Sequence, residues 1–415
     1  MHILYLHQYF ITPQQVGGTR SYEFARRFVN AGHQVTMLTA QDRSFPWTGK
    51  NPFRKREIMG IQVIEIKAGY ADSRYGTTLS YWKRMFNFLH FALISSCALF
   101  SLSMPDVIFA TSTPLTIGIP ALFARKRWRV PFVFEVRDLW PEAPIQMAAL
   151  KNPVNIALAR WLERTIYRHA EHIVALSPGM AEGVQQAGVA AQKVSVIPNA
   201  SDIELFHPDV DGAAVRDRLR LHGRFVCTYF GAMGEANDLT YVLQAARILQ
   251  TKQEQQIVFV LHGHGKRRAE LQAFCQQHHL MNVVFSDSVP EKDYIAQLAA
   301  ASDVCMTIYK NVPVLYTCSP NKFFDALAAG RPVLVNTPGW LQELVNTYEV
   351  GVFVQPENAE SLVEQVTYLR DHPELCARYG KNARRLAETQ FSRDQLAAQL
   401  LEILHHIAIK QERQA

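Results

Sequence analysis

The chain of 415 residues carries 43 basic and 37 acidic residues, a formal net charge of +6 at pH 7, and 48% of its residues are hydrophobic. This length and apolar content exclude a disordered protein and exceed one ordinary core, so two globular domains are expected. Six scattered cysteines form no Cys-x-x-Cys pair. That excludes a disulfide framework and a cysteine zinc site, and it indicates buried thiols in a reducing compartment.

The N-terminus and the charge distribution predict the location and a partner. Residues 1–6 lack the basic segment of a secretory signal, so we expect a cytoplasmic protein. Residues 1–200 have a net charge of +10, and residues 201–415 have −4. A basic first half favours an anionic partner, either nucleic acid or a membrane surface. An uneven distribution without any partner is the alternative.

Short apolar runs alternate with helix-length segments along the whole chain. In the first half the predicted strands are 3–6, 34–38, 63–66, 107–110, 132–136, 173–176 and 194–197. In the second half they are 226–230, 258–261, 283–285, 304–308, 333–335 and 352–354. Most are continuous Val, Ile and Phe runs, which is typical of strands buried on both faces. The alternation occurs twice, so the sequence predicts an α/β protein with two doubly wound parallel sheets.

The predicted domains are 1–200 and 201–392, with a linker near 198–210. A predicted helix over about 393–411 comes too late for the second sheet, so we expect it to pack back near the first domain. Residues 85–102 carry no formal charge and approach the length of a membrane span. Polar residues interrupt them, however, and a helix beside the domain with an interfacial patch at 81–86 is favoured.

A glycine pair follows the first predicted strand and precedes a helix. Gly17, Gly18 and Thr19 stand at this turn. Small residues let a ligand approach the backbone, and the free amides of a helix N-terminus attract phosphate. These three residues are candidate ligand contacts, and a tight turn without a ligand is the alternative.

A charged cluster follows the predicted strand at 132–136, at its carboxyl end. Doubly wound sheets place their ligands at this end. Placing charged side chains there costs free energy unless they bind a ligand. The candidate site residues are therefore Arg137, Asp138 and Glu142. A capped turn held by an Arg–Asp pair is the alternative.

The segment 319–333 carries the most specific pattern in the chain. Ser319 is predicted to cap a helix with Pro320 at its first position, and Gly330 is predicted to be the C-cap. Lys322 lies in the first turn, where a cation opposes the helix dipole.

An anion at this helix N-terminus would explain the position of Lys322. Ser319, Pro320 and Asn321 would then bind the anion together with the lysine. Asp325 lies one turn further, about 5 Å along the axis, within reach of a sugar hydroxyl of the same ligand. A plain solvated helix start is the alternative.

Two glycine-rich turns follow strands in the second half. Gly231 and Gly234 follow one predicted strand, and Gly263 follows the next. They either bring the backbone close to a nucleotide or serve only as strand–helix turns. His262 and His264 have no nearby carboxylate or cysteine, so no metal site is expected.

The chain resembles family 4 glycosyltransferases of the GT-B fold, and specifically the WbuB-like branch that builds bacterial surface polysaccharides. The segments that carry the resemblance cover nearly the whole length: HQYFITPQQVGGTRSYEFARRFVNAGHQVTMLTA, PDVIFATSTPLTIGIPALFARKRWRVPFVFEVRDLWPEAP, ALSPGM, VIPNASDIELFHP, YFGAMGEANDL, LHGHGKRRAEL and SPNKFFDALAAGRPVLV.

The resemblance implies two Rossmann-like domains that face a central cleft, with the nucleotide held mainly by the second. It also implies retention of anomeric configuration, no metal, and no cofactor beyond a nucleotide-sugar substrate, with a UDP-linked sugar favoured. Asp325 matches the second acidic residue of a Glu-x7-Glu motif that binds the ribose. Residues 319–321 match a loop that contacts the diphosphate and sugar, Lys322 would support the leaving diphosphate, and residues 17–18 match the N-terminal glycine loop.

Three positions depart from the broad family pattern. Thr317 stands in place of the first Glu of Glu-x7-Glu. Arg137 replaces a His that contacts the sugar in many members. The Arg and Lys that usually hold the diphosphate are missing from 231–239. These departures raise the expected importance of Lys322, Lys310 and Arg137.

The prediction is a retaining hexosyl- or N-acetylhexosaminyl-transferase of O-antigen, capsule or exopolysaccharide synthesis. Its expected acceptor is a polyprenyl-diphosphate-linked saccharide. Its basic first domain is expected to lie on the inner face of the cytoplasmic membrane, without a nucleic-acid partner. The catalytic candidates are Lys322, Arg137, Asp138 and Glu142.

Two alternatives from other classes stay open. A nucleotide-sugar epimerase of the same fold would need paired acid–base carboxylates and histidines that the sequence does not present. A non-catalytic sugar-nucleotide-binding scaffold subunit is supported only by the departures at Thr317 and Arg137.

Overall fold

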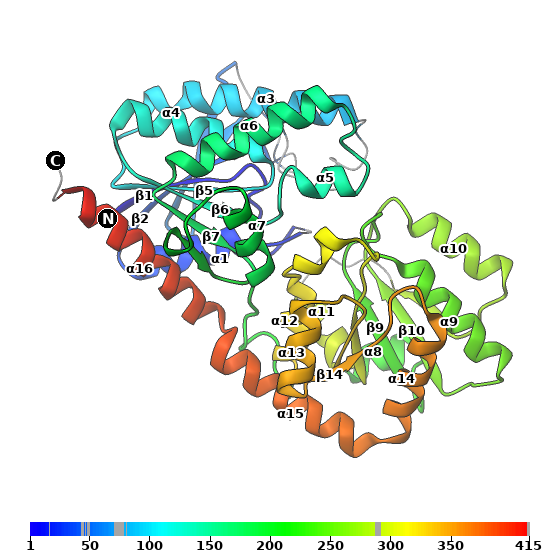
Figure 1. The fold of residues 1–415 in the computed structure, drawn as a ribbon. Helices are drawn as coiled ribbons and strands as arrows, with labels where there is room; N and C mark the ends of the chain where they lie inside the picture. The colour runs from blue at the N-terminus through cyan, green and yellow to red at the C-terminus, as the bar shows by residue number, and fades with distance from the viewer. Residues whose placement is uncertain are drawn as a thin grey trace. The chain divides into compact units, whose positions relative to one another are not determined.

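The computed structural model describes residues 1–15, 17–42, 45, 47, 50–69, 79, 81–286 and 292–412. The chain divides into two compact units. The first unit comprises Met1–Pro198 and Asp394–Ala415, and the second comprises Asn199–Arg393. Each unit is an α/β layer structure built on one sheet (Figure 1).

The sheet of the first unit has the strand order β3-β4-β2-β1-β5-β6-β7-β8. The strands are β1 (His2–Leu6), β2 (Gln34–Ala40), β3 (Phe53–Ile58), β4 (Ile61–Ile66), β5 (Val107–Thr111), β6 (Phe132–Val136), β7 (His172–Ala175) and β8 (Val194–Val196). All neighbours are parallel except β3, which pairs antiparallel with β4. Each strand predicted for the first half is present, so the parallel doubly wound sheet is confirmed.

The edge strand β3 is the element that the sequence analysis missed. Its residues are mostly charged and partly exposed, so they lack the apolar run that identifies buried strands. Arg54 and Arg56 bind Glu65 on β4, with the Arg56 nitrogen 2.8 Å from the carboxylate. Ion pairs to a neighbouring strand therefore take part in holding this edge.

Helices cover both faces of the first sheet. They are α1 (Arg20–Asn30), α3 (Tyr81–Ala98), α4 (Gly118–Trp128), α5 (Glu142–Gln146), α6 (Pro153–His169), α7 (Pro178–Gln186) and α16 (Arg393–Glu412), with short 3-10 turns η1 (Leu99–Ser101), η2 (Leu115–Ile117) and η3 (Ala191–Lys193). Helices α3, α4 and α6 lie over one face, and α1 lies over the other (Figure 1). The first unit includes α16 from Asp394 onward, and Arg27 of α1 forms an ion pair with Asp394. No helix among the described residues is long and apolar enough to cross a bilayer.

The second sheet is fully parallel, in the order β11-β10-β9-β12-β13-β14. Its strands are β9 (Phe225–Phe230), β10 (Ile257–His262), β11 (Val283–Ser286), β12 (Val304–Thr307), β13 (Val333–Val335) and β14 (Gly351–Phe353). Its helices are α8 (Ala213–Leu219), α9 (Leu239–Thr251), α10 (Arg268–Gln277), α11 (Lys292–Ala300), η4 (Pro313–Thr317), α12 (Asn321–Ala328), α13 (Trp340–Tyr348), α14 (Ala359–Asp371) and α15 (Pro373–Gln390). Each strand predicted for the second half is present.

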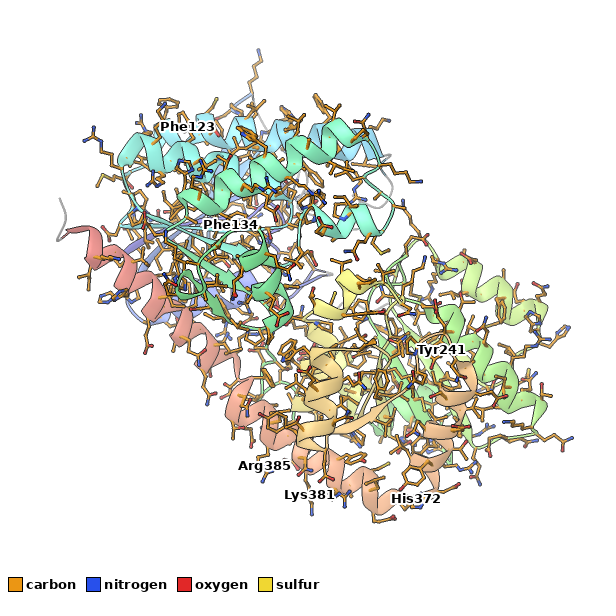
Figure 2. The ribbon with its side chains drawn as sticks, viewed as in Figure 1. Phe123, Phe134, Tyr241, His372, Lys381 and Arg385 are labelled. Atoms are coloured by element: carbon orange, nitrogen blue, oxygen red, sulfur yellow. The ribbon has the colours of Figure 1, made fainter. Side chains whose placement is uncertain are left out.

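Alternating strand residues divide the second core into two layers. Val226 and Phe230 of β9 pack with α11, α12, α13 and α15, whereas Cys227 and Tyr229 pack with α9 and α14. Side chains fill these layers in both units, and Figure 2 marks Phe134 in the first and Tyr241 in the second. The order of both sheets reverses at one point, between β1 and β5 and between β9 and β12. Doubly wound proteins bind ligands at the carboxyl ends of the strands at such points.

Candidate active site

In the second unit, the predicted helix start differs in detail from the sequence reading. Helix α12 begins at Asn321 with Pro320 in the N-cap position, and no side chain caps it. The prediction that Ser319 caps the helix is therefore wrong. The Ser319 hydroxyl instead accepts a hydrogen bond from the backbone N–H of Asn199 at 3.0 Å, and its carbonyl accepts one from the Asn199 side chain at 2.5 Å.

The end of α12 also differs by one residue. The helix ends at Ala328, Ala329 is its C-cap, and Gly330 follows with φ +65°. A left-handed residue just beyond the C-cap is the usual place for glycine. Gly330 therefore terminates the helix from the position after the predicted one.

Lys322 and Asp325 lie on the same side of α12. Both are half-buried, whereas Phe323, Phe324 and Leu327 are buried in the core. Residues three apart are neighbours on a helix surface. The amphipathic pattern of α12 thus turns both predicted ligand contacts away from the core.

Lys322 is held beneath the turn that follows β9. Its Nζ donates to the Tyr229 hydroxyl at 2.6 Å and to the Asn237 side chain at 3.3 Å, and it lies 3.9 Å from the centroid of the Tyr229 ring. Burial lowers the pKa of Lys322 to about 7. The lysine has no carboxylate partner among the contacts that the structure gives it, so an anionic ligand would stabilise its charge.

Gly231 makes room for this lysine. A Cβ at Gly231 would lie 3.1 Å from the Lys322 Nζ, and φ at this residue is +146°. A side chain would crowd the ammonium group and would strain the backbone. The glycine turn and the lysine of α12 therefore form one structural unit, although they are far apart in the sequence.

The second glycine turn packs directly against the first. A Cβ at Gly263 would lie 1.8 Å from the Gly231 carbonyl oxygen, and the Met233 N–H donates to the His264 carbonyl at 2.7 Å. Close packing of two backbones is thus sufficient to explain Gly263. Around Gly234, by contrast, no described atom lies within 4 Å of a built Cβ, so this turn is open.

Two further predicted contacts lie near this end of the sheet. The Lys310 N–H donates to the Ala236 carbonyl at 2.9 Å, and its side chain is exposed. Thr317 lies in η4, and its hydroxyl donates to the Val314 carbonyl at 2.8 Å. The structure thus gives Thr317 a local backbone contact.

Asp325 lies in a mixed-charge cluster. Burial raises its pKa to about 6, against the opposing effect of Lys292 and Arg393. Arg393 also pairs with Asp202 at 2.6 Å, and Lys292 lies 3.8 Å from the same carboxylate. Besides burial, two cations and the Asp202 carboxylate therefore act on the charge of Asp325.

In the first unit, the glycine turn leads into α1. Gly17 has φ +140°, and α1 begins at Arg20 after Thr19. The Thr19 hydroxyl is buried and has no hydrogen-bond partner within the described residues, and no side chain caps the helix. The start of α1 thus presents backbone amides and an unsatisfied hydroxyl.

Arg20 forms a buried ion pair that the sequence analysis did not predict. Its guanidinium lies 2.9 Å from the Glu135 carboxylate and also donates to the carbonyls of Ile197 and Pro198. Thr111 donates to the other Glu135 oxygen at 2.9 Å. The sequence did contain a signal for a partner of Arg20, because a cation in the first turn of a helix opposes the helix dipole.

Arg137 reaches a buried histidine. Its guanidinium lies 3.3 Å from Nε2 of His7, and Nδ1 of His7 lies 2.7 Å from the Ser21 hydroxyl. Burial, reinforced by Arg137, holds the pKa of His7 well below its usual value. A neutral His7 that accepts from Arg137 must carry its proton on Nδ1 and donate to Ser21. His7 was missed, although a histidine directly after the first strand was a signal.

The other two charged candidates turn to separate partners. The Asp138 carboxylate accepts a hydrogen bond from Thr113 at 2.8 Å, and desolvation raises its pKa. Glu142 begins α5 and pairs with the exposed Arg160 of α6 at 2.8 Å. The cluster is therefore not a turn held by an Arg–Asp pair. Within the described part of the chain, no His, Cys, Asp and Glu side chains gather in threes as metal ligands.

Comparison with known protein families shows matches over both units of the chain. Residues 17–200 match the family described as Glycosyl transferase 4-like domain, and residues 214–386 match Glycosyl transferases group 1. The chain belongs to the group 1 glycosyltransferases. It is 26% identical over 388 residues to WcaI of Escherichia coli K12, described as a colanic acid biosynthesis glycosyl transferase, and the alignment covers 89% of this chain and 93% of that relative.

Solved structures show that this glycosyltransferase has the GT-B fold. Sucrose-phosphate synthase of Thermosynechococcus elongatus matches with a TM-score of 0.79 and 19% identity, covering 98% of each chain. Anabaena HepE in complex with UDP-glucose matches with a TM-score of 0.72 and 19% identity, covering 98% of this chain and 100% of that one. The resemblance read from the sequence is therefore confirmed at the level of family and fold.

Proposed function

We propose that this glycosyltransferase moves a hexosyl or N-acetylhexosaminyl group, with retention, from a UDP-linked sugar to a polyprenyl-diphosphate-linked saccharide. The product belongs to a surface polysaccharide such as O-antigen, capsule or exopolysaccharide. The observation that carries the donor half of this proposal is Lys322, a partly desolvated cation held at the carboxyl end of the second sheet.

The chemistry requires departure of a nucleoside diphosphate from the anomeric carbon. Negative charge grows on the diphosphate as the bond breaks, so cations and amides already aimed at that place lower the barrier. Lys322 and the uncapped start of α12 supply this charge, and the half-buried Asp325 accepts hydrogen bonds from the ribose. We propose that Lys322, and not a metal ion, stabilises the charge of the leaving diphosphate. The enzyme is therefore expected to need no metal.

Arg137 and Asp138 are the proposed contacts of the donor sugar or the acceptor in the first unit. A hydrogen bond to His7, which is itself bonded to Ser21, orients the Arg137 side chain. Glu142 has the weaker case, because its carboxylate is paired with Arg160.

Nucleotide binding tests the donor site. Calorimetry with UDP, GDP and dTDP is expected to show selective binding of UDP. Lys322→Ala and Asp325→Ala are each expected to weaken it by about 10- to 100-fold, the range for losing a hydrogen bond to a charged group. Lys252→Ala removes a cation from an exposed pair with Glu360 and is expected to bind like the wild type. Equal indifference to all three nucleotides, in a folded protein, contradicts the donor site.

The proposed lipid-linked acceptor requires contact with a membrane. The helices on one face of the first unit carry exposed apolar side chains, which we call the α3–α6 apolar surface: Phe86, Leu89, Leu93, Phe100, Met104, Val154, Leu158 and Trp161. Trp161 is 65% exposed, and Arg127 lies over the Phe100 ring at 4.6 Å. Exposed cations lie on α3, α4 and α6 or next to the ends of these helices: Lys83, Arg84, Lys126, Arg127, Arg129, Lys151 and Arg164. Exposed apolar side chains and cations on the same helices fit an anionic lipid surface.

Vesicle binding tests this docking. The protein is expected to sediment with anionic vesicles at low salt and to be released at high salt, because the attraction between surface charges is screened. Phe100→Ser/Trp161→Ser is expected to weaken binding by at least about tenfold, because each buried aromatic side chain contributes roughly 1.5–3 kcal/mol. Met281→Ser, which changes an 86%-exposed residue of the second unit, is the matched control. Binding that ignores vesicle charge contradicts the proposal.

A further inference from the structure

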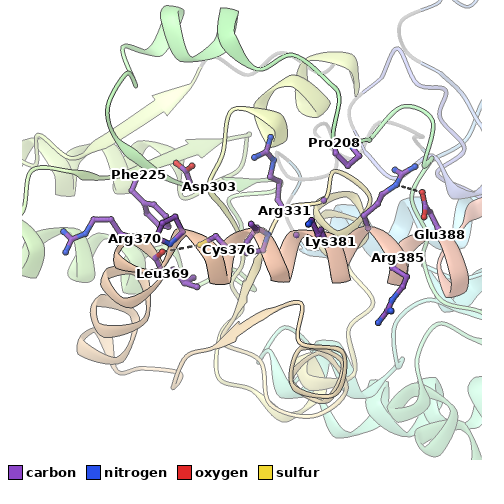
Figure 3. Close-up of a pocket in the computed structure, with 16 residues that line it drawn as sticks. Pro208, Phe225, Asp303, Arg331, Leu369, Arg370, Cys376, Lys381, Arg385 and Glu388 are labelled. Carbon is purple, nitrogen blue, oxygen red and sulfur yellow. Dashed lines mark hydrogen bonds and ion pairs between the residues drawn. The ribbon is translucent and has the colours of Figure 1, made fainter.

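A pocket lies in the second unit, and none of the predicted donor residues lines it. Figure 3 shows the residues that do. Its volume is about 510 Å³, and Phe225, Asp303 and Pro332 line it. Phe225 is the first residue of β9, and the other two immediately precede β12 and β13. The predicted donor residues follow the carboxyl ends of the same sheet, and a six-residue strand spans about 20 Å. The pocket is therefore at the opposite edge of the sheet.

Helix α15 forms one wall of the pocket. This wall runs from Pro373 to Glu388, and two glycines bring the helix close to the end of α12. A Cβ at Gly380 would lie 2.4 Å from the Gly330 carbonyl oxygen. Its volume lies within the range of small-molecule sites, roughly 300–1,000 Å³.

Cations outnumber carboxylates in this pocket, and the carboxylates are already used. Asp303 pairs with Arg216 at 2.9 Å, and Glu388 pairs with Arg384 at 2.6 Å. Arg384 also donates to backbone carbonyls, and Arg370 pairs with acidic residues outside the pocket. Neither carboxylate is therefore available to the remaining cations.

Three cations in the pocket have no acidic partner in the described structure: Arg331, Lys381 and Arg385. Lys381 and Arg385 are exposed and lie one turn apart on α15, and neither side chain has a hydrogen bond within the described residues. Arg331 donates to the Ala300 carbonyl at 2.6 Å, but its Nε is buried without a partner. A buried donor without a partner is unusual in a native structure, so the protein itself does not fully satisfy the Arg331 guanidinium.

We propose that this pocket binds a phosphate-bearing small molecule. Guanidinium and ammonium groups recognise phosphate oxygens through charge-assisted hydrogen bonds. Arg331 and Lys381 are the proposed phosphate ligands, Arg385 adds positive charge nearby, and Phe225 and Pro373 offer apolar surface to an organic group. Inorganic phosphate and a phosphate ester share this chemistry. Only the organic group of the ester would also contact the apolar side chains of the pocket.

Calorimetric titration of the full chain with inorganic phosphate and with ribose 5-phosphate tests the proposal. Saturable binding is expected, weakened by at least about tenfold in Lys381→Ala/Arg385→Ala, because Lys381 loses a charged hydrogen bond to the phosphate and Arg385 no longer adds positive charge beside it. Lys252→Ala/Arg378→Ala removes the same charge outside the pocket, with Arg378 on the same helix, and is expected to bind like the wild type. Lys322→Ala is also expected to retain binding, which separates this pocket from the donor site.

The two probes identify the source of the phosphate. Tighter binding of ribose 5-phosphate shows that the apolar side chains contact an organic group, and equal binding shows that phosphate alone is recognised. The proposal is overturned if neither probe saturates, if the pocket variant binds like the wild type, or if its control loses binding equally. None of these outcomes depends on the result of nucleotide binding at Lys322.

Discussion

Lys322→Met is expected to lower kcat by about 10²- to 10³-fold, the usual effect of removing one preorganised group that stabilises charge in a transition state. Methionine keeps an unbranched apolar chain next to Tyr229 and Gly231 but removes the ammonium group. The rate is measured as release of the nucleotide from the donor that calorimetry selects. Lys252→Met, at an exposed pair, is expected to leave kcat unchanged. A fall in kcat of less than a few-fold contradicts the assigned role.

The pH dependence of UDP affinity gives an independent check of the same role. Burial lowers the pKa of Lys322 to about 7, so its positive charge is present below that pH and is lost above it. Burial raises the pKa of Asp325 to about 6, so its negative charge is present above that pH and is lost below it. UDP affinity is thus expected to be greatest between about pH 6 and 7.

Variants separate the two limbs of this profile. Lys322→Met is expected to remove the alkaline limb, and Asp325→Asn is expected to remove the acid limb. Affinities are compared as the ratio of wild type to variant at each pH, which cancels the titration of UDP itself. A ratio that does not change with pH, for either variant, contradicts the assignment of that residue.

The sequence predicted the fold well because buried parallel strands leave a direct signal. Runs such as those at β9 and β10 are apolar on both faces and separated by helix-length segments. The exception, β3, is stabilised by ion pairs between Arg54, Arg56 and Glu65 instead of by apolar burial. Charged residues on an edge strand do not differ in pattern from those in a loop.

The position of the candidate site residues on their sheets was predictable, but their contacts were not. Residues just after a parallel strand must lie at the carboxyl edge of the sheet, which placed Gly231 and Arg137 correctly. The partners of Lys322 are 93 and 85 residues away, and tertiary packing alone brings them together. The same reason explains the error at Ser319, whose hydroxyl binds Asn199 instead of capping α12.

Arg20→Met is expected to lower the free energy of unfolding by about 3–5 kcal/mol, because it leaves a buried carboxylate without its cation. Arg20 is 3% exposed and Glu135 is fully buried, with 2.9 Å between the charged atoms. The substitution also removes the donors to the carbonyls of Ile197 and Pro198. Denaturation followed by circular dichroism, with hydrogen exchange to locate the change in the first unit, measures the effect.

An exposed pair in the same unit provides the matched control. Arg160 and Glu142 lie 2.8 Å apart with side chains 48% and 41% exposed, so Arg160→Met is expected to cost less than about 1 kcal/mol. The double variant Arg20→Met/Glu135→Leu is expected to regain part of the lost stability, because it removes the isolated charge as well. Arg20 joins α1 to β6 and to the backbone at Ile197 and Pro198. If Arg20→Met lowers the free energy of unfolding no more than Arg160→Met does, the buried pair does not stabilise this junction.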